Sequence, residues 1–173
     1  MSPSRLRPLT AEAFAPYGEV IEAAGATVGI NAGTAARFPD LAQLDAGPSG
    51  RLAFSLFRAM PRPLPFTLQV MERHPLGSQL FFPVGDAAYV VAVAPAGPAP
   101  SVAEIRLFVA RPGQGVNFAR GVWHHPLIAL FSPATFVVVD RVGEGENCDE
   151  RALGPDAPVV EASAVRALLG AEA

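Results

Sequence analysis

Short apolar runs, each bounded by Gly or Pro, fill the middle of the chain between Arg51 and Val142. They predict eight β-strands, at residues 52–57, 66–72, 79–84, 87–94, 105–110, 116–118, 127–131 and 136–142. Many short strands at close spacing, separated by turn residues, are typical of a β-sandwich or β-barrel. The pattern therefore predicts a mainly β fold.

The two ends of the chain carry helical signals. Thr10 is a suitable N-cap for a short helix over residues 11–15, which Pro16 ends. Near the C-terminus, apolar residues at helical spacing predict a second short helix at residues 163–169. Residues 25–50 show no regular pattern, and we expect them to be mostly loop.

The chain has 173 residues, which suits one domain with one core. We divide this single domain, residues 1–173, into three parts. Residues 1–50 contain the N-terminal helix and loop, residues 51–142 contain the β-barrel, and residues 143–173 contain a loop and the C-terminal helix.

Composition and charge exclude several classes of function. Half of the residues are hydrophobic and 17% are charged, as expected for a well-buried interior. The net charge of -3 leaves no basic surplus for a nucleic-acid partner. No apolar run reaches the ~18 residues of a membrane span, and the first residues lack the apolar stretch of a signal peptide. With Cys148 as the single cysteine, these features predict a cytoplasmic protein that binds neither membrane nor nucleic acid.

An acid and an imidazole stand at the end of one predicted strand. Alternation puts Glu72 and His74 on the same side as Phe66, Leu68 and Val70. If that side faces the core, both polar groups lie in the mouth of the barrel and need a partner or a metal. If the strand has already ended, both groups reach solvent.

The other two histidines, His124 and His125, are consecutive and point to opposite sides of a strand. Only one of them can share an interior with Glu72 and His74, so we expect one to belong to a site and the other to support it. The alternative is a histidine pair satisfied by backbone carbonyls near a turn.

Two further polar segments have simple structural interpretations. Asp140 and Arg141 end an apolar strand, where a strand-end ion pair is expected. Cys148 follows in a loop rich in Gly and Glu, and we favour a turn over a catalytic thiol because nothing in the sequence lowers its pKa.

Several motifs together resemble the ureidoglycolate lyase family. In the second half of the chain they are residues 72–79 (ERHPLGSQ) followed by Pro83, residues 114–117 (QGVN), 122–127 (VWHHPL), 140–141 (DR) and 147–149 (NCD). In the N-terminal part they are residues 13–14 (AF), 17–22 (YGEVIE), 30–31 (IN) and 40–42 (DLA). The similarity extends in the same order from about Leu9 to Asp149, and the set is specific although each motif alone is not.

The resemblance implies a fold, an assembly and an activity. We expect a cupin-like double-stranded β-helix, or jelly-roll barrel, with short N- and C-terminal helices, which agrees with the eight predicted strands. The resemblance also implies a homodimer that splits (S)-ureidoglycolate into glyoxylate and urea in allantoin degradation. Two alternatives stay open: a hydrolase that releases ammonia from the same substrate, and a non-catalytic cupin that binds a small 2-oxo or 2-hydroxy acid.

The resemblance to cupins also implies a site. Cupin motif positions fall on Glu72, His74 and Gln79 in the first motif and on His124 in the second. Glu72 stands where a histidine is usual, and Gln79 where a glutamate is usual. These four residues are candidate ligands of a divalent metal, held more weakly because an amide donates less charge than a carboxylate. Without a metal, they form a polar pocket with one acid and two imidazoles.

Roles for individual residues follow from the expected reaction. Glu72, His74 and His124 are the expected catalytic residues, with Glu72 or an unliganded His124 as the general base. The expected substrate-binding residues comprise arginines for the carboxylate, hydrogen-bonding groups for the ureido moiety and polar neighbours of the catalytic set: Asn31, Ser55, Arg58, Arg73, Gln79, Arg120 and His125. The loops at residues 25–50 and 143–149 are candidate lids.

Overall fold

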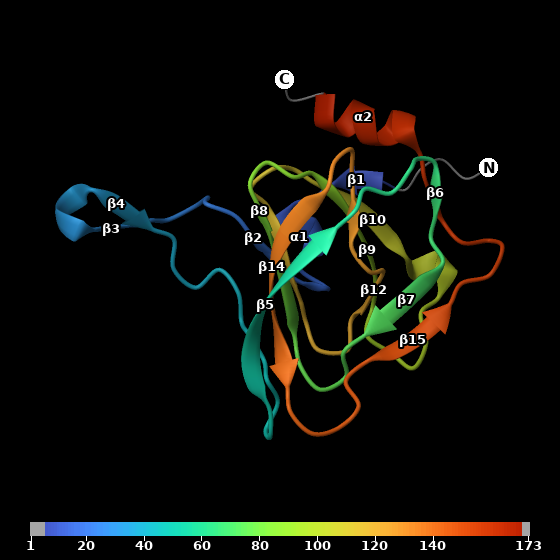
Figure 1. Cartoon of the computed structure of the whole chain (residues 1–173), viewed down its shortest axis with the longest axis horizontal. Helices are drawn as coiled ribbons and strands as arrows, with labels where there is room; N and C mark the ends of the chain where they lie inside the picture. The colour runs from blue at the N-terminus through green and yellow to red at the C-terminus, as the bar shows by residue number, and fades with distance from the viewer. Residues whose placement is uncertain (1–5, 171–173) are drawn as a thin grey trace.

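The structure, a computed structural model, describes residues 6–170 and is built mainly from β-strands (Figure 1). One sheet has seven strands: β1 (Leu6–Pro8), β7 (Val70–Arg73), β9 (Tyr89–Ala94), β10 (Arg106–Ala110), β12 (Trp123–His124), β13 (Ile128–Ala129) and β15 (Asp149–Ala152). The other has five: β2 (Gly18–Ile21), β5 (Arg51–Ala59), β8 (Gln79–Val84), β11 (Gly115–Phe118) and β14 (Ala134–Val142). The predicted mainly β fold is confirmed.

Smaller elements complete the chain. Two-stranded pairs form between β3 (Val28–Ile30) and β4 (Ala35–Arg37), and between β6 (Phe66–Thr67) and β16 (Val159–Val160). The helices are α1 (Ala11–Phe14) and α2 (Ala162–Gly170), with 3-10 turns η1 (Asn31–Gly33) and η2 (Val102–Glu104). Both predicted helices are therefore confirmed, and the Thr10 side chain caps the first by accepting a hydrogen bond from the Ala13 amide.

The main core lies between the two sheets. Phe81 and Val138 of the five-stranded sheet and Val91 and Val93 of the seven-stranded sheet belong to the same buried cluster. Across residues 6–170, strands pair only within their own sheet, so the jelly roll is a sandwich of two layers. The fold class agrees with the prediction, but the sheets are not closed into one barrel.

A second core covers the outer face of the seven-stranded sheet. Val90 and Ala92 of β9 pack there with Trp123, Val160 and Val165, and helix α2 lies across this side (Figure 1). Strand β9 is consequently buried on both faces, which explains its uninterrupted apolar run.

The predicted strand over residues 66–72 is interrupted, and the interruption reverses its alternation. Leu68 donates its backbone N–H to Pro158 between β6 and β7, at 3.0 Å. After this break Met71, and not Val70, joins Phe66 in the second core. Glu72 therefore shares a face with Val70, as expected, but not with Phe66 and Leu68, and that part of the expectation is wrong.

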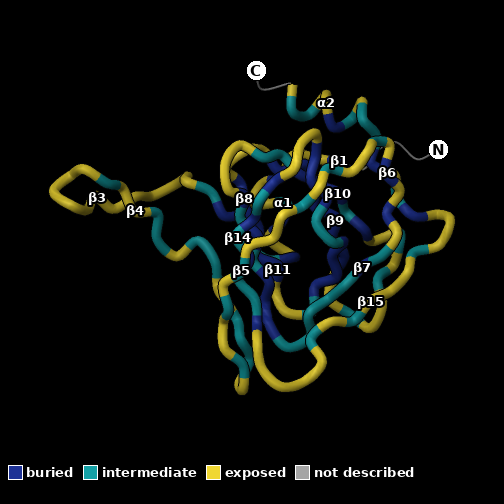
Figure 2. Tube along the Cα trace, in the orientation of Figure 1, coloured by how far each residue is buried: buried dark blue, intermediate teal, exposed yellow. Residues whose placement is uncertain are grey.

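The segment at residues 25–50 is not simply loop. Strands β3 and β4 form a hairpin that projects from the body on the side of the five-stranded sheet (Figure 1). Residues 23–34 are all exposed (Figure 2). Neither helix of residues 6–170 has the length and hydrophobicity that crossing a membrane requires.

Candidate active site

Four polar side chains converge between the sheets, where β7, β8 and β12 lie close together. His124 pairs with Glu72 across β12 and β7, and its Nε2 lies 3.5 Å from Glu72 Oε1. Gln79, the first residue of β8, places its Oε1 3.0 Å from His74 Nε2 and 3.2 Å from His124 Nε2. The structure thus brings together the four residues that the cupin motifs single out.

Asp140 sets the orientation of the Gln79 amide. It lies opposite Gln79 in the register of β14 and β8, and its Oδ2 accepts a hydrogen bond of 3.3 Å from Gln79 Nε2. A carboxylate accepts and does not donate, so the amide nitrogen faces Asp140 and the amide oxygen faces the two imidazoles. The expected strand-end ion pair of Asp140 and Arg141 is absent from the ion pairs of residues 6–170.

The far nitrogen of each imidazole meets a backbone carbonyl. His74 Nδ1 lies 2.6 Å from the carbonyl oxygen of Asn147, and His124 Nδ1 lies 3.1 Å from that of Val122. Because a carbonyl only accepts, each Nδ1 carries the proton in these contacts. A neutral imidazole then directs the lone pair of its Nε2 toward Gln79 Oε1.

The charge states follow from burial and from these contacts. Burial lowers the pKa of His124 below its ordinary value and outweighs the opposing effect of Glu72, so His124 is neutral at neutral pH. Burial also acts to raise the pKa of Glu72, but a hydrogen bond from His124 and the charge of the nearby imidazoles, which these rings offer when protonated, outweigh it, and the net shift is downward. The site therefore pairs an ionised carboxylate with a neutral imidazole.

This donor set suits a cation. Ligand atoms of Glu72, His74 and His124 all lie within 4.8 Å of one another, and Gln79 adds an amide oxygen beside both imidazoles. Two imidazole nitrogens and two oxygens match the ligands that divalent transition metals accept. The carbonyl contacts at each Nδ1 are those that commonly orient metal-binding histidines. The residues thus fit a divalent metal.

A pocket of about 400 Å³ opens beside Glu72. The other lining residues are mostly apolar, with one arginine: Phe57, Arg58, Ala59, Phe81, Pro126 and Leu127. A small anionic substrate bound there would lie next to both a carboxylate and an arginine. Arg58 is the only predicted substrate-binding arginine on this lining.

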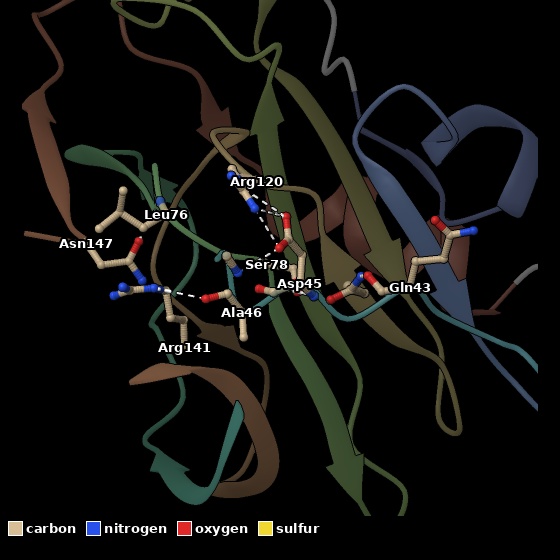
Figure 3. Close-up of polar contacts among 10 residues, drawn as sticks. Gln43, Asp45, Ala46, Leu76, Ser78, Arg120, Arg141 and Asn147 are labelled. Atoms are coloured by element: carbon tan, nitrogen blue, oxygen red, sulfur yellow. Dashed lines mark hydrogen bonds and ion pairs between the residues drawn. The ribbon is translucent and has the colours of Figure 1, made fainter. Parts of the chain in front are cut away.

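Two predicted substrate-binding arginines are engaged elsewhere. Arg73 donates to Asp149 at 2.7 Å, and its guanidinium stacks over the ring of Trp123 at 4.9 Å. Arg120 forms a two-point ion pair with Asp45, with nitrogen–oxygen distances of 2.8 and 2.6 Å (Figure 3). Neither guanidinium reaches the four-residue cluster, because each belongs to a contact that joins two segments of the chain.

The remaining predicted substrate-binding residues lie in three different parts of the fold. Ser55 shares its side of β5 with Phe57 and lies opposite Val138, so it faces the space between the sheets. His125 packs edge-on against Phe66 with ring centroids 5.5 Å apart, and its Nε2 is buried without a hydrogen-bond partner among residues 6–170. Asn31 lies exposed at the tip of the projecting hairpin, and the chain does not bring it to the site.

Hydrogen bonds hold the loop at residues 143–149 to the body of the protein. Arg141 donates to the Glu144 carbonyl at 2.8 Å, and the Asn147 side chain accepts from the Leu76 amide at 2.8 Å. Asn147 and Asp140, which lie in two of the family motifs, were not predicted to support the site. Exposed Cys148 has its pKa raised by burial and by neighbouring carboxylates, which agrees with a non-catalytic thiol.

Part of the other expected lid, residues 25–50, is also held to the body of the protein by hydrogen bonds. The Asp45 amide donates to the Ser78 hydroxyl and the Ser78 amide donates to the Asp45 carbonyl, each at 2.8 Å. Arg141 donates to the Ala46 carbonyl at 3.0 Å (Figure 3). Within residues 25–50, the free-standing part is thus the β3–β4 hairpin.

Known proteins resemble this chain over most of its length. The family model for ureidoglycolate lyase matches residues 2–160. A protein named ureidoglycolate lyase from Burkholderia mallei is 54% identical over 150 residues, which cover 86% of this chain and 88% of the relative. One of the same name from Azotobacter vinelandii is 45% identical over 153 residues, covering 87% and 92%.

Among solved structures, a dTDP sugar isomerase from Desulfovibrio desulfuricans is similar with a TM-score of 0.45 at 16% identity, covering 87% of this chain and 90% of that one. The family model and the relatives agree with the resemblance that the sequence motifs indicated. The chain belongs to the ureidoglycolate lyase family.

Proposed function

We propose that this protein is a ureidoglycolate lyase that splits (S)-ureidoglycolate into glyoxylate and urea. The family match and the relatives support the activity. The observation that carries it structurally is the convergence of one carboxylate and two imidazoles beside a pocket that Arg58 also borders.

The reaction needs one proton transfer in each direction. Removing the proton from the substrate hydroxyl lets its oxygen form the carbonyl of glyoxylate as the carbon–nitrogen bond breaks. The bonding electron pair leaves with the ureido nitrogen, which takes up a proton and departs as urea. No water is consumed, and an acid and a base are both required.

Glu72 is the proposed base. Its pKa is lowered, so the carboxylate is ionised at neutral pH, and it lines the pocket into which a substrate would enter. A neighbouring imidazole or a water molecule returns the proton to the leaving nitrogen. His124, buried and neutral, stands 3.5 Å from the base and orients it.

Glu72, His74, Gln79 and His124 are the proposed ligands of a divalent metal. When bound there, the metal would stabilise the negative charge that develops on the substrate oxygen. The carbonyls of Asn147 and Val122 and the carboxylate of Asp140 hold the ligands in orientation. The amide of Gln79 in place of a carboxylate favours an exchangeable metal.

Arg58 is the proposed binder of the substrate carboxylate. A guanidinium suits this task because its parallel N–H groups match two carboxylate oxygens. Arg58 borders the same pocket as Glu72, whereas Arg73 and Arg120 hold structural ion pairs. Ser55 on the inner side of β5 is the proposed partner of the ureido group.

We further propose that the protein acts as a cytoplasmic homodimer in allantoin degradation. The family resemblance supports the pathway and the assembly. The exposed free thiol of Cys148 is typical of a reducing compartment.

Product analysis tests the activity. Purified protein is incubated with racemic ureidoglycolate, and glyoxylate, urea and ammonia are measured together. The proposal predicts equal amounts of glyoxylate and urea, formed from one enantiomer. Ammonia in place of urea would identify a hydrolase, and binding without any product would identify a non-catalytic cupin.

A further inference from the structure

A second pocket lies outside the candidate active site. It has a volume of about 380 Å³ and is formed by the segment that follows β5, the bend after β13 and the start of helix α2. Its lining combines two arginines, Arg62 and Arg166, with apolar residues. It shares no lining residue with the pocket beside Glu72, so a ligand bound here would leave that pocket open.

The two arginines of this pocket have no acidic partner. Neither Arg62 nor Arg166 forms an ion pair or a side-chain hydrogen bond with any residue between positions 6 and 170. No Asp or Glu is on the lining, although the chain has 16 acidic residues and 13 basic ones. Two positive charges at one pocket repel each other, and an anion bound between them removes that repulsion.

The backbone holds Arg62 at the pocket. Its amide donates a hydrogen bond of 3.0 Å to the Ala129 carbonyl, and Pro61 forms a bridge with the same residue. Pro61 and Pro63 flank Arg62, and their fixed φ angles restrict this segment further. The Arg62 guanidinium lies over the ring of Phe66, 5.3 Å from its centroid. This contact positions the charge without using its N–H donors, which stay available for an anion.

Helix α2 provides another side of the pocket. Fully buried Val165 anchors the helix in the second core. Ala162 and Arg166 are four residues apart, so they share a helix face, and both line the pocket. Ala162 is the first residue of α2, where backbone N–H groups lack partners within the helix and the helix dipole favours an anion. The preceding acid, Glu161, is not on the lining.

An exposed aromatic ring gives the pocket an apolar surface. Phe131 lines the pocket and is 59% exposed. Its φ of 64° lies in the left-handed region, which is unfavourable for a bulky side chain and recurs at ligand-binding sites. Leu64 and the two prolines extend this surface. A bare inorganic anion would leave these apolar groups in water, whereas an anion with an organic group would cover them.

We propose that this pocket binds a small organic phosphate monoester, with the phosphate between Arg62 and Arg166 and the organic group against Phe131. A phosphate monoester carries close to two negative charges at neutral pH, and its oxygens match the paired N–H groups of guanidinium. The volume lies in the range of small-molecule sites. The proposal concerns binding alone and does not depend on the lyase activity.

Calorimetric titration of the full chain in a buffer without phosphate tests the proposal. Phenyl phosphate is the probe because it joins a dianion to one planar ring, and inorganic phosphate provides the dianion alone. Phenyl phosphate should bind at one site per chain, about tenfold or more tightly than inorganic phosphate. No binding of phenyl phosphate up to about 10 mM, or equal affinity for both anions, would overturn the proposal.

Arginine variants test which charges bind the phosphate. Arg62→Ala and Arg166→Ala should each weaken phenyl phosphate binding about tenfold or more, because each removes a charged hydrogen-bond donor. Arg37→Ala is the matched control, since it removes the same charge from the exposed hairpin, which Figure 1 shows far from α2. Its affinity should not change. Unchanged affinity in both pocket variants would overturn the site. If one of them does not fold, as judged by circular dichroism, the other decides.

Further variants separate this pocket from the candidate active site, which also contains an arginine. Arg58→Ala should bind phenyl phosphate as the wild type does. Loss of binding in Arg58→Ala, with Arg62→Ala unaffected, would place the anion beside Glu72 and overturn the proposal. Phe131→Ala should weaken binding of phenyl phosphate but not of inorganic phosphate, and an equal effect on both would remove the ring from the site.

Lyase kinetics keep this proposal distinct from the proposed function. Arg62 and Arg166 do not line the pocket beside Glu72, so kcat/KM of Arg62→Ala and Arg166→Ala should equal that of the wild type. Phenyl phosphate binding is measured without the lyase substrate. A protein without lyase activity can therefore still confirm this site, and an active lyase can still refute it.

Discussion

Asp140 accepts a hydrogen bond from Gln79 across β14 and β8, and this contact determines which atom of the amide faces the two imidazoles. With its nitrogen held by Asp140, Gln79 presents an oxygen to His74 Nε2 and His124 Nε2. Gln79 Oε1 and the Nε2 atoms of His74 and His124 therefore direct lone pairs toward one another. A proton or a metal cation is needed between these groups, because electron-rich atoms at 3.0 to 3.5 Å otherwise repel one another.

We expect the contact between Asp140 and Gln79 to be needed for the site. Asp140→Asn allows the Gln79 amide to turn, and supporting contacts of this kind are worth about 10–100-fold in metal affinity or activity. Metal affinity by calorimetry and kcat/KM should both fall in this range. In the double variant with Asp140→Asn and Gln79→Glu, the side chain at position 140 can donate a hydrogen bond to a carboxylate at position 79. Metal affinity and kcat/KM should therefore recover. If Asp140→Asn alone leaves metal affinity and kcat/KM unchanged, Asp140 does not have this role.

Glu72→Gln should abolish most of the turnover. The amide keeps the shape of the side chain but cannot accept the hydroxyl proton, and general-base catalysis contributes about 10²–10⁴-fold to kcat. Steady-state kinetics on the purified variant should show this loss in kcat, with circular dichroism unchanged. Near-normal turnover would exclude Glu72 as the base and leave His124 as the candidate.

Metal binding should depend on one of the two consecutive histidines and not on the other. His124→Ala removes an imidazole from the cluster, whereas His125 packs on Phe66 away from it. Titration with Mn²⁺ or Zn²⁺ should show binding to the wild type and to His125→Ala, and strongly reduced binding to His124→Ala. Equal binding by all three proteins would place the metal elsewhere. Chelation followed by rescue with the same ion should reproduce the pattern in the lyase assay.

Arg58 should determine substrate affinity. Removing its guanidinium leaves the substrate carboxylate without a charged partner, and hydrogen bonds to charged groups are worth about 1.5–3 kcal/mol, or roughly 10–150-fold in binding. Arg58→Ala should therefore raise KM by this factor. Arg120→Ala is the comparison, because Arg120 is held by Asp45 at the surface, and its KM should change little. The reverse order of the two effects would assign the carboxylate to Arg120.

Acidification should destabilise the fold through the buried histidines. Burial lowers the pKa of both His124 and His125 in the folded chain. Below the ordinary value of 6.5 the unfolded chain binds protons more readily, so the free energy of unfolding decreases as pH falls. Denaturant titrations at about pH 7.5 and about pH 5.5 should show this decrease, and it should be smaller in His125→Gln. A stability that rises on acidification would contradict the burial argument.

The sequence by itself determined the fold class, the two helices and the four residues of the site. Gly and Pro mark the ends of short apolar runs, and these local sequence signals are enough to predict strands in a mainly β chain. Glu72, His74, Gln79 and His124 were predicted from the resemblance to cupin motifs, and the structure brings them together. Arg58 was one of three arginines that the sequence could not tell apart.

Only the tertiary structure decided how these residues meet. The break after Leu68 reverses the alternation before Glu72, because the Leu68 amide bonds to Pro158, about ninety residues further along the chain. The pairing of Asp140 with Gln79 likewise depends on the register of two strands that are distant in sequence. Periodicity describes neighbours along one strand, whereas register and sheet order arise from contacts between strands, and those contacts place the carboxylate and the imidazoles.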